Sequence, residues 1–298
     1  MIVKPPSTLL IGPPGSGKTH SLVTYLKAGL KLAVVITDPG GEESLIEACE
    51  KEGADITNLH YRYIAPAAPS FATLMDMAKK INMLPYKDLT ELKSGINKQD
   101  FRQFYELLAT LSNFVCQRTD KEIGPVDELD SSWALAIDSA SGLNTMVMTN
   151  MIGAKPAAHQ GEWGAAMNSE ERLIDKLTSD LKCFFCLTAH VEREMDETIG
   201  RPINMASFLG RKLAPKIPRN FSDVVYTVRE ADKFRWSTTA SNIDLKARTL
   251  KLSDNLEPSF EQVVEGWQRR VKMAEASSAT SATSASSGAS KEASASKS

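Results

Sequence analysis

The sequence predicts an α/β fold in which a mainly parallel sheet is covered by helices on both faces. Within residues 1–273, short apolar runs of strand length alternate with segments of helical periodicity. The first run leads straight into a glycine-rich loop and an amphipathic helix, and the runs at 32–38 and 133–139 are apolar over most of their length. Such runs are typical of strands that are buried on both faces of a parallel sheet.

The loop after the first strand fills every fixed position of the nucleotide-binding P-loop, Gly-Pro-Pro-Gly-Ser-Gly-Lys-Thr at 12–19. Glycines allow positive φ and close approach of the backbone, and the backbone amides after Pro14 and the helix N-terminus attract an anion. Lys18 would reach the β and γ phosphates, and the Thr19 hydroxyl would coordinate Mg²⁺. The residues expected to bind the nucleotide are Gly12, Gly15, Ser16, Gly17, Lys18, Thr19 and His20.

The segments that follow continue the alternation. A second strand over 32–38 ends in Asp-Pro-Gly-Gly, and a third is predicted over 60–64. Helical spacing of Leu, Met and Phe then runs over 71–118, interrupted by Pro85 and Gly95. We expect a helical insertion over residues 71–130, packed as a cap on one face of the sheet.

A second chemical motif follows about 120 residues after the P-loop, where the strand 133–139 has the form of a Walker B strand. Its carboxylate, Asp138, stands at the strand's C-terminal end, where it would hold Mg²⁺. An amphipathic helix is expected over 170–181 and a strand over 183–188, whose Cys183 and Cys186 would point to opposite faces and remain buried. A hairpin is predicted from 224–228 and 234–238, turning near Ala231 and Asp232.

Composition narrows the function classes. The net charge is −2 and the pI about 6.2, which is not the signature of a dedicated duplex-DNA binder. No apolar run approaches the ~20 residues that span a bilayer, and no signal peptide is recognised, so we expect a cytoplasmic protein without membrane contact. The Ala/Ser-rich segment 274–298 is predicted to be a disordered tail.

Five segments together resemble one family, the RecA-like phage nucleotide-binding proteins. These are AAA-type P-loop ATPases that include single-strand annealing proteins of the Sak type. The resemblance implies a RecA-like P-loop NTPase fold with a C-terminal β-hairpin, ATP and Mg²⁺ as cofactors, and the host bacterial cytoplasm as location if the chain is phage-encoded. The strand ending in Thr-Ala-His would lie between the P-loop and Walker B strands. The segments are GPPGSGKT (12–19), ITDPGG (36–41), ALAIDSAS (134–141), CLTAH (186–190) and FLGRKLAPKIPRNFSDVV (208–225).

The resemblance also implies roles for single residues. Asp38 stands where RecA-like proteins commonly have a water-activating glutamate, and Asp138 would be the Mg²⁺ partner. His190 would sense the γ-phosphate, and Lys246 and Arg248 look like the KxR element that KaiC-like and hexameric-helicase relatives insert into a neighbour's site. The residues alone leave alternatives open: a turn cap for Asp38, an ordinary strand-end histidine, and solvated surface charge for Lys246 and Arg248.

Two segments are candidate DNA contacts. The predicted loop 191–212 mixes cations with an aromatic side chain, as single-strand binding requires, although its first half is rich in carboxylates. A second predicted loop, 141–170, lies beside the Walker B strand; both could instead be plain mobile loops. The candidates are Arg193, Arg201, Phe208, Arg211 and Lys212 in the first loop, and Lys155, His159 and Trp163 in the second.

Two functions from different classes follow. The first is a weak ATPase that forms a homo-oligomer, binds single-stranded DNA and acts in DNA recombination or annealing together with a single-stranded-DNA-binding protein. The second is an ATP-dependent switch or loader that binds a protein partner and hardly hydrolyses.

Overall fold

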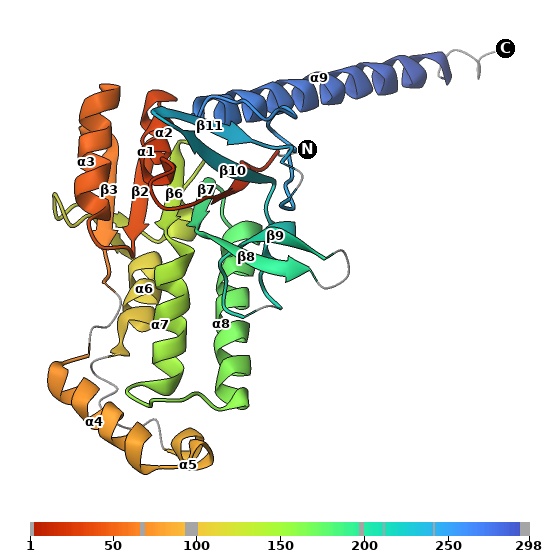
Figure 1. The fold of residues 1–298 in the computed structure, drawn as a ribbon. Helices are drawn as coiled ribbons and strands as arrows, with labels where there is room; N and C mark the ends of the chain where they lie inside the picture. Colours follow the sequence, from red (N-terminus) through yellow and green to blue (C-terminus); the bar gives the residue numbers. More distant parts are fainter. Residues whose placement is uncertain are drawn as a thin grey trace.

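A computed structural model describes residues 3–65, 69–92, 101–196, 200–210, 212–240 and 242–292. Its centre is a seven-stranded sheet in the order β11-β10-β1-β7-β6-β2-β3 (Figure 1). Every neighbouring pair is parallel except β10 and β11, so the predicted α/β class is confirmed. β7 lies between β1 and β6, as expected for a RecA-like fold. The strands are β1 Ser7–Ile11, β2 Lys31–Ile36, β3 Leu59–Tyr63, β6 Trp133–Asp138, β7 Phe184–Ala189, β10 Asp223–Glu230 and β11 Lys233–Ser237.

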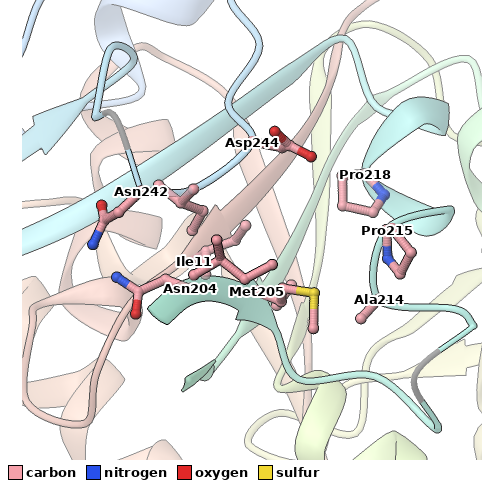
Figure 2. A pocket seen from close by; sticks show the side chains of 11 residues that line it. Ile11, Asn204, Met205, Ala214, Pro215, Pro218, Asn242 and Asp244 are labelled. Carbon is pink, nitrogen blue, oxygen red and sulfur yellow. The ribbon is translucent and has the colours of Figure 1, made fainter. Parts of the chain in front are cut away.

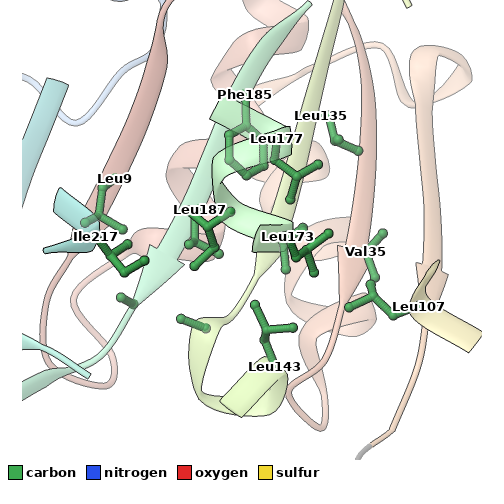
Figure 3. Packing of buried hydrophobic residues seen from close by; sticks show 14 of the residues in the cluster. Leu9, Val35, Leu107, Leu135, Leu143, Leu173, Leu177, Phe185, Leu187 and Ile217 are labelled. Carbon is green, nitrogen blue, oxygen red and sulfur yellow. The ribbon is translucent and has the colours of Figure 1, made fainter. Parts of the chain in front are cut away.

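Helices cover both faces of this sheet because successive strand residues point to opposite sides. Leu9 belongs to one apolar cluster and Leu10 to the other. Figure 3 shows the first cluster, in which Leu107, Leu143 and Leu173 pack on the strands. Its helices are α6 Gln103–Ser112, α7 Ala140–Ile152 and α8 Gln160–Ser179, and the opposite face carries α1 Lys18–Leu22, α2 Thr24–Lys27, α3 Gly41–Glu52 and the start of α9 Glu261–Glu292.

The 71–130 segment differs from the expected cap. Its later part, from α6 through Phe114 to the turn η3, Val126–Glu128, and Leu129, buries side chains against the sheet cluster. Helix α4, Phe71–Met83, has no buried residue, and α5, Tyr86–Glu91, buries only Leu89. Both lie away from the sheet, at the bottom of Figure 1. Helical periodicity therefore predicted these helices, but it could not show which of them have a surface to pack on. The segment also contains the short strands β4, Phe114–Val115, and β5, Glu122–Gly124.

Both predicted loops near the Walker B strand are largely regular structure. Residues 140–152 and 160–179 form α7 and α8, which are joined by a short connection. Residues 191–206 form the antiparallel hairpin of β8, Val191–Asp196, and β9, Arg201–Ala206. The prediction of loops was wrong because the helix N-cap at Ser139 and the alternation along 191–196 were not recognised. The structure also has the short 3₁₀ helices η1, Ile56–Asn58, and η4, Ile217–Asn220.

Helix α9 also differs from the prediction, because it continues through much of the Ala/Ser-rich segment that was expected to be disordered. The high helix propensity of alanine explains this continuation. Its beginning is anchored: Trp267 Nε1 donates to Val3 O at 3.0 Å, and Phe260 stacks on Tyr25 with ring centroids 4.0 Å apart. The later part projects away from the sheet (Figure 1). None of the helices in the described ranges has the length and apolar character needed to cross a membrane.

Candidate nucleotide-binding site

The P-loop connects β1 to α1 at the carboxyl edge of the sheet. Gly15 and Gly17 have φ of 71° and 85°, which side chains other than glycine rarely adopt. At Gly12, an added Cβ would stand 1.8 Å from Thr227 Oγ1, so β10 requires a glycine there. Ser16 Oγ lies 2.6 Å from the same threonine hydroxyl. The loop is therefore held in shape by the neighbouring strand.

Lys18 is almost completely buried beneath this loop. Its Nζ donates to the carbonyl oxygens of Gly12 and Pro13, both at 2.9 Å. Burial removes water from the ammonium and lowers the pKa of Lys18 to about 8, although the nearby Asp138 and Asp38 carboxylates oppose the shift. The interaction free energy between this buried ammonium and a bound anion is larger than for a lysine on the surface, because water screens it less.

Thr19 and Asp138 meet, as the motifs require. The Thr19 hydroxyl donates to Asp138 Oδ2 at 2.6 Å, and the Thr188 hydroxyl donates to Oδ1 of the same carboxylate. Burial raises the pKa of Asp138, while the two hydroxyl donors oppose that effect. Hydroxyl and carboxylate oxygens are ligands that Mg²⁺ prefers. The described residues contain no group of three His, Cys, Asp or Glu side chains that could hold a metal.

A second polar group stands beside the first. Ser139 Oγ donates to Asp38 Oδ2 at 2.7 Å, and His190 Nε2 lies 3.5 Å from the same oxygen. Burial raises the pKa of Asp38, but the hydrogen bonds from His190 and Ser139 outweigh burial and leave that pKa below its usual value. The three residues follow β2, β6 and β7, whose carboxyl ends share one edge. The structure thus brings Asp38 and His190 together.

A cavity of about 350 Å³ joins these groups. The predicted ligand His20 lines it, and its Nε2 lies 2.9 Å from Glu52 Oε1. Sequence reasoning missed Thr188 and Phe234. The alternation back from buried Trp236 could have placed Phe234 on the face toward the P-loop. The lining residues are Pro14, Gly15, Ser16, Gly17, Lys18, Thr19, His20, Asp38, Ser44, Glu47, Ala48, Lys51, Asp138, His190 and Phe234.

Lys246 and Arg248 lie at the opposite edge of the sheet. Lys246 Nζ donates to the carbonyl oxygens of Arg219 and Phe221, so its ammonium is hydrogen-bonded within its own chain. The Arg248 amide donates to Asp223 Oδ1 at 2.8 Å, and its side chain is exposed. Asp223 is the first residue of β10, which runs parallel to the P-loop strand β1. Lys246 and Arg248 therefore lie at the amino ends of these strands, whereas the P-loop of the same chain lies at the carboxyl ends. The segment makes one isolated bridge, between Lys246 and Val224, and is not part of a strand.

The candidate DNA-contact residues of the hairpin do not share one face. Arg193 pairs with Asn204 in the β8–β9 register, whereas Arg201 pairs with Asp196, so the two arginines lie on opposite faces. Glu192 and Glu194 share the face of Arg201. Lys212 is exposed after the hairpin, and Arg211 lies outside the described residues.

A hollow of about 310 Å³ lies beside the foot of this hairpin (Figure 2). Ile203, Asn204 and Met205 of β9 line one side, and residues 242–244 line the other. The Asn204 backbone N–H donates to Asn242 O at 2.7 Å, so a backbone hydrogen bond links β9 to the segment that lines the other side.

Phe208 is not a stacking platform, because it is 5% exposed and belongs to the core cluster beneath the sheet. Replacing Phe208 with alanine should lower the free energy of unfolding by about 3–5 kcal/mol, as for other buried aromatic residues. Urea denaturation measures this loss. Unchanged stability together with lost affinity for single-stranded DNA would contradict the core position.

Lys155, His159 and Trp163 are not beside the Walker B strand as predicted. They lie around the turn between α7 and α8, at the end of α7 that is remote from Asp138 (Figure 1). Lys155 Nζ donates to Glu162 at 2.7 Å, and His159 caps α8. Their polar groups therefore stabilise a helix start.

Glu170 of α8 is fully buried under the segment that follows the hairpin. Its Oε2 accepts from the Leu209 amide at 3.2 Å, while Oε1 has no protein partner. Burial raises its pKa from 4.5 to about 8, although the bond from Leu209 opposes the shift. Between these values, the folded carboxyl keeps a proton that the unfolded chain releases. Glu170 should therefore lower stability as pH rises through this range, by at most ~1.4 kcal/mol per pH unit.

The isosteric Glu170→Gln variant tests this expectation, because its amide oxygen can still accept from Leu209 N. Compared with wild type, it should show a flatter fall of the denaturation midpoint between pH 5 and pH 8, within the window set by the pKa shift from 4.5 to about 8. Parallel curves for the two proteins would show that Glu170 titrates normally.

Comparison with known proteins adds little to this geometry. No protein-family model and no curated protein sequence matches the chain. Among solved structures, the crystal structure of the RadB recombinase is similar to 85% of this chain, over 86% of its own chain, with 15% sequence identity and a TM-score of 0.42. The fold assignment accordingly rests on the strand order and on the positions of the P-loop and Asp138.

Proposed function

We propose that this chain is an ATP-binding protein that works as a homo-oligomer on single-stranded DNA in recombination or strand annealing. The observation that supports it most is the contact of Thr19 with Asp138 beside the buried Lys18 ammonium. The residues fit a triphosphate with Mg²⁺: the P-loop amides and Lys18 would hold phosphate, and Thr19 and Asp138 would hold the cation. Bound Mg²⁺ would neutralise phosphate charge.

The choice of ATP rests on the family resemblance, so GTP is the competitor to test. The string Asn-Lys-Gln-Asp at 97–100 matches the NKxD pattern by which GTPases read guanine. It lies between α5 and α6, outside the described residues. If the proposal is right, unlabelled GTP displaces labelled ATP less well than unlabelled ATP does.

Hydrolysis is proposed to be slow and to depend on a neighbouring copy. Asp38 would orient the attacking water, with Ser139 and His190 holding its carboxylate in place. Arg248 is exposed at the far edge of the sheet, so it could reach only the P-loop of another copy. Lys246 would place that segment through its bonds to Arg219 and Phe221.

A subunit-mixing assay tests the shared site. The Arg248→Ala and Lys18→Ala proteins should each have little ATPase activity, and an equal mixture should regain part of it, because Arg248 of one would complete the P-loop of the other. Full activity of the Arg248→Ala protein alone would leave Arg248 as a surface charge.

Single-stranded DNA is proposed to bind on the Arg193 face of the hairpin, together with Lys212. This face avoids Glu192 and Glu194, and Met195 on it is 65% exposed. The hairpin starts directly after His190, whose carbonyl accepts from Ser207 N at 2.8 Å and closes the hairpin base. A displacement of His190 by a γ-phosphate would therefore move the hairpin. A single-stranded-DNA-binding protein is the proposed partner.

Two arginines of one hairpin give a matched experiment. Arg193→Ala should weaken ATP-dependent binding to single-stranded DNA by about tenfold and reduce its salt slope by about 1. Arg201→Ala, on the carboxylate face, should change affinity less. Fluorescence anisotropy with labelled oligonucleotides measures both, and equal or absent effects would remove the assigned face.

The alternative is an ATP-dependent switch or loader for a protein partner. The length of Asp38 and its engagement with Ser139 and His190 favour it, because both limit the activation of water. ATPase activity with and without single-stranded DNA, recorded together with light scattering, separates the two. ATP hydrolysis that single-stranded DNA stimulates, together with assembly, supports the recombination role. ATP binding with neither stimulated hydrolysis nor assembly supports the switch.

A further inference from the structure

A second hollow, of about 380 Å³, continues from the P-loop cavity along α1. The two share Gly17, His20, Lys51 and Phe234 in their linings. The second one has no part in the phosphate and Mg²⁺ chemistry described above. It ends at Thr24 and at the segment 257–259 that precedes α9.

Phe234 forms one wall of this hollow and comes from β11, at the far end of the sequence from the P-loop. Its ring atoms stand 3.1–3.6 Å from the position of a Cβ on Gly17, the N-cap residue of α1. The guanidinium of Arg229, opposite on β10, lies 5.5 Å from the ring centroid. The ring is nevertheless 41% exposed, although a phenyl side chain gains free energy when it is covered. An aromatic surface is thus available immediately beside the phosphate site.

The rest of the lining includes polar and charged side chains. Glu52 Oε1 lies 2.9 Å from His20 Nε2, and Lys27 Nζ donates to Glu52 Oε2 at 2.7 Å. The hydrogen bonds from Lys27 and His20 lower the pKa of Glu52. The hollow therefore offers an aromatic ring together with an ionised carboxylate and its cations. This combination suits a flat heterocycle with N–H donors and the hydroxyls of a sugar.

We propose that this hollow is the nucleoside subsite of the chain and that Phe234 stacks on a purine base there. The inference rests on the proposed function, since it places the base of the nucleotide whose phosphates the P-loop would hold. His20 and Glu52 then face the sugar and the base edge. This gives a role to the predicted nucleotide ligand His20, which the structure pairs with Glu52. A purine is favoured over a pyrimidine because its larger face covers more of the ring.

The test compares wild-type protein with Phe234→Ala, Phe234→Trp and the control Phe71→Ala, whose ring on α4 is 89% exposed. Affinities for ATP, CTP and inorganic tripolyphosphate are measured by calorimetry in the presence of Mg²⁺. Phe234→Ala should weaken ATP by about tenfold, as loss of one stacking contact does, and leave tripolyphosphate unchanged. Phe234→Ala should also reduce the ratio of the affinity for ATP to the affinity for CTP. Phe234→Trp should retain ATP affinity, and Phe71→Ala should behave as wild type.

The outcomes separate this inference from the proposed function. Wild-type protein that binds neither ATP nor tripolyphosphate overturns the proposed function and the subsite together. Wild-type protein that binds both, with Phe234→Ala unchanged toward ATP, overturns the subsite alone. A Phe234→Ala protein that loses tripolyphosphate as strongly as ATP has a damaged P-loop, and this would assign Phe234 to loop support instead of base stacking.

Discussion

Replacing Lys18 with alanine should weaken ATP binding by at least about 100-fold, the largest effect expected for a single substitution in this protein. Lys18 is 6% exposed and its ammonium donates to two P-loop carbonyls, so an incoming phosphate meets a charge that water scarcely screens. Calorimetric titration with ATP and Mg²⁺ measures the loss. The fold should tolerate the change, since the variant removes a buried charge.

The control for this variant is Lys182→Ala, which removes an exposed lysine from the opposite edge of the sheet, just before β7. Its ATP affinity should equal that of wild type. If Lys18→Ala binds ATP normally, or if both variants lose affinity alike, the P-loop assignment fails and the proposed function fails with it.

Replacing Asp138 with asparagine should abolish Mg²⁺-dependent hydrolysis, with a loss on the order of 100-fold or more in turnover. The neutral amide keeps the shape of the carboxylate but removes the charge that would balance the cation. The same change should not destabilise the protein in the absence of nucleotide, because burial already disfavours the charged form of Asp138.

Thermal unfolding separates these two effects. For the wild-type protein, ATP with Mg²⁺ should raise the unfolding midpoint more than ATP alone does. Asp138→Asn should lose that extra gain, while its nucleotide-free midpoint stays the same or rises. Asp88→Asn, an exposed substitution on α5, provides the control. An Asp138→Asn protein with normal Mg²⁺-dependent turnover would exclude Asp138 as the metal partner.

Much of the site could be predicted because its chemistry is local. The P-loop conformation depends on Gly15 and Gly17, and the strand that ends in Asp138 is recognised by its apolar run. Cys183 and Cys186 also lie in opposite clusters as the strand period requires. Each of these features is determined within a few residues, so one sequence suffices to find it.

Several of the predictions that failed concern burial and exposure of side chains. Phe208 and Arg193 belong to the same predicted loop, yet one is core and the other exposed. Helix α4 has helical periodicity but no surface to pack on. Burial depends on which segments lie opposite in space, and spacing along the chain does not contain that information.

The sequence by itself determined the α/β class, the phosphate-binding loop and the Asp138 carboxylate, because short-range backbone geometry and strand periodicity dictate them. Only the tertiary structure decided that Asp38, Ser139 and His190 meet, that Arg248 lies at the edge remote from its own P-loop, and that Phe234 stands beside Gly17. The contacts of Asp38 and of Phe234 join segments that are more than 100 residues apart in the sequence. Arg248 and the P-loop lie at opposite edges of one sheet. The order in which parallel strands assemble fixes them, and that order follows from packing over the whole chain.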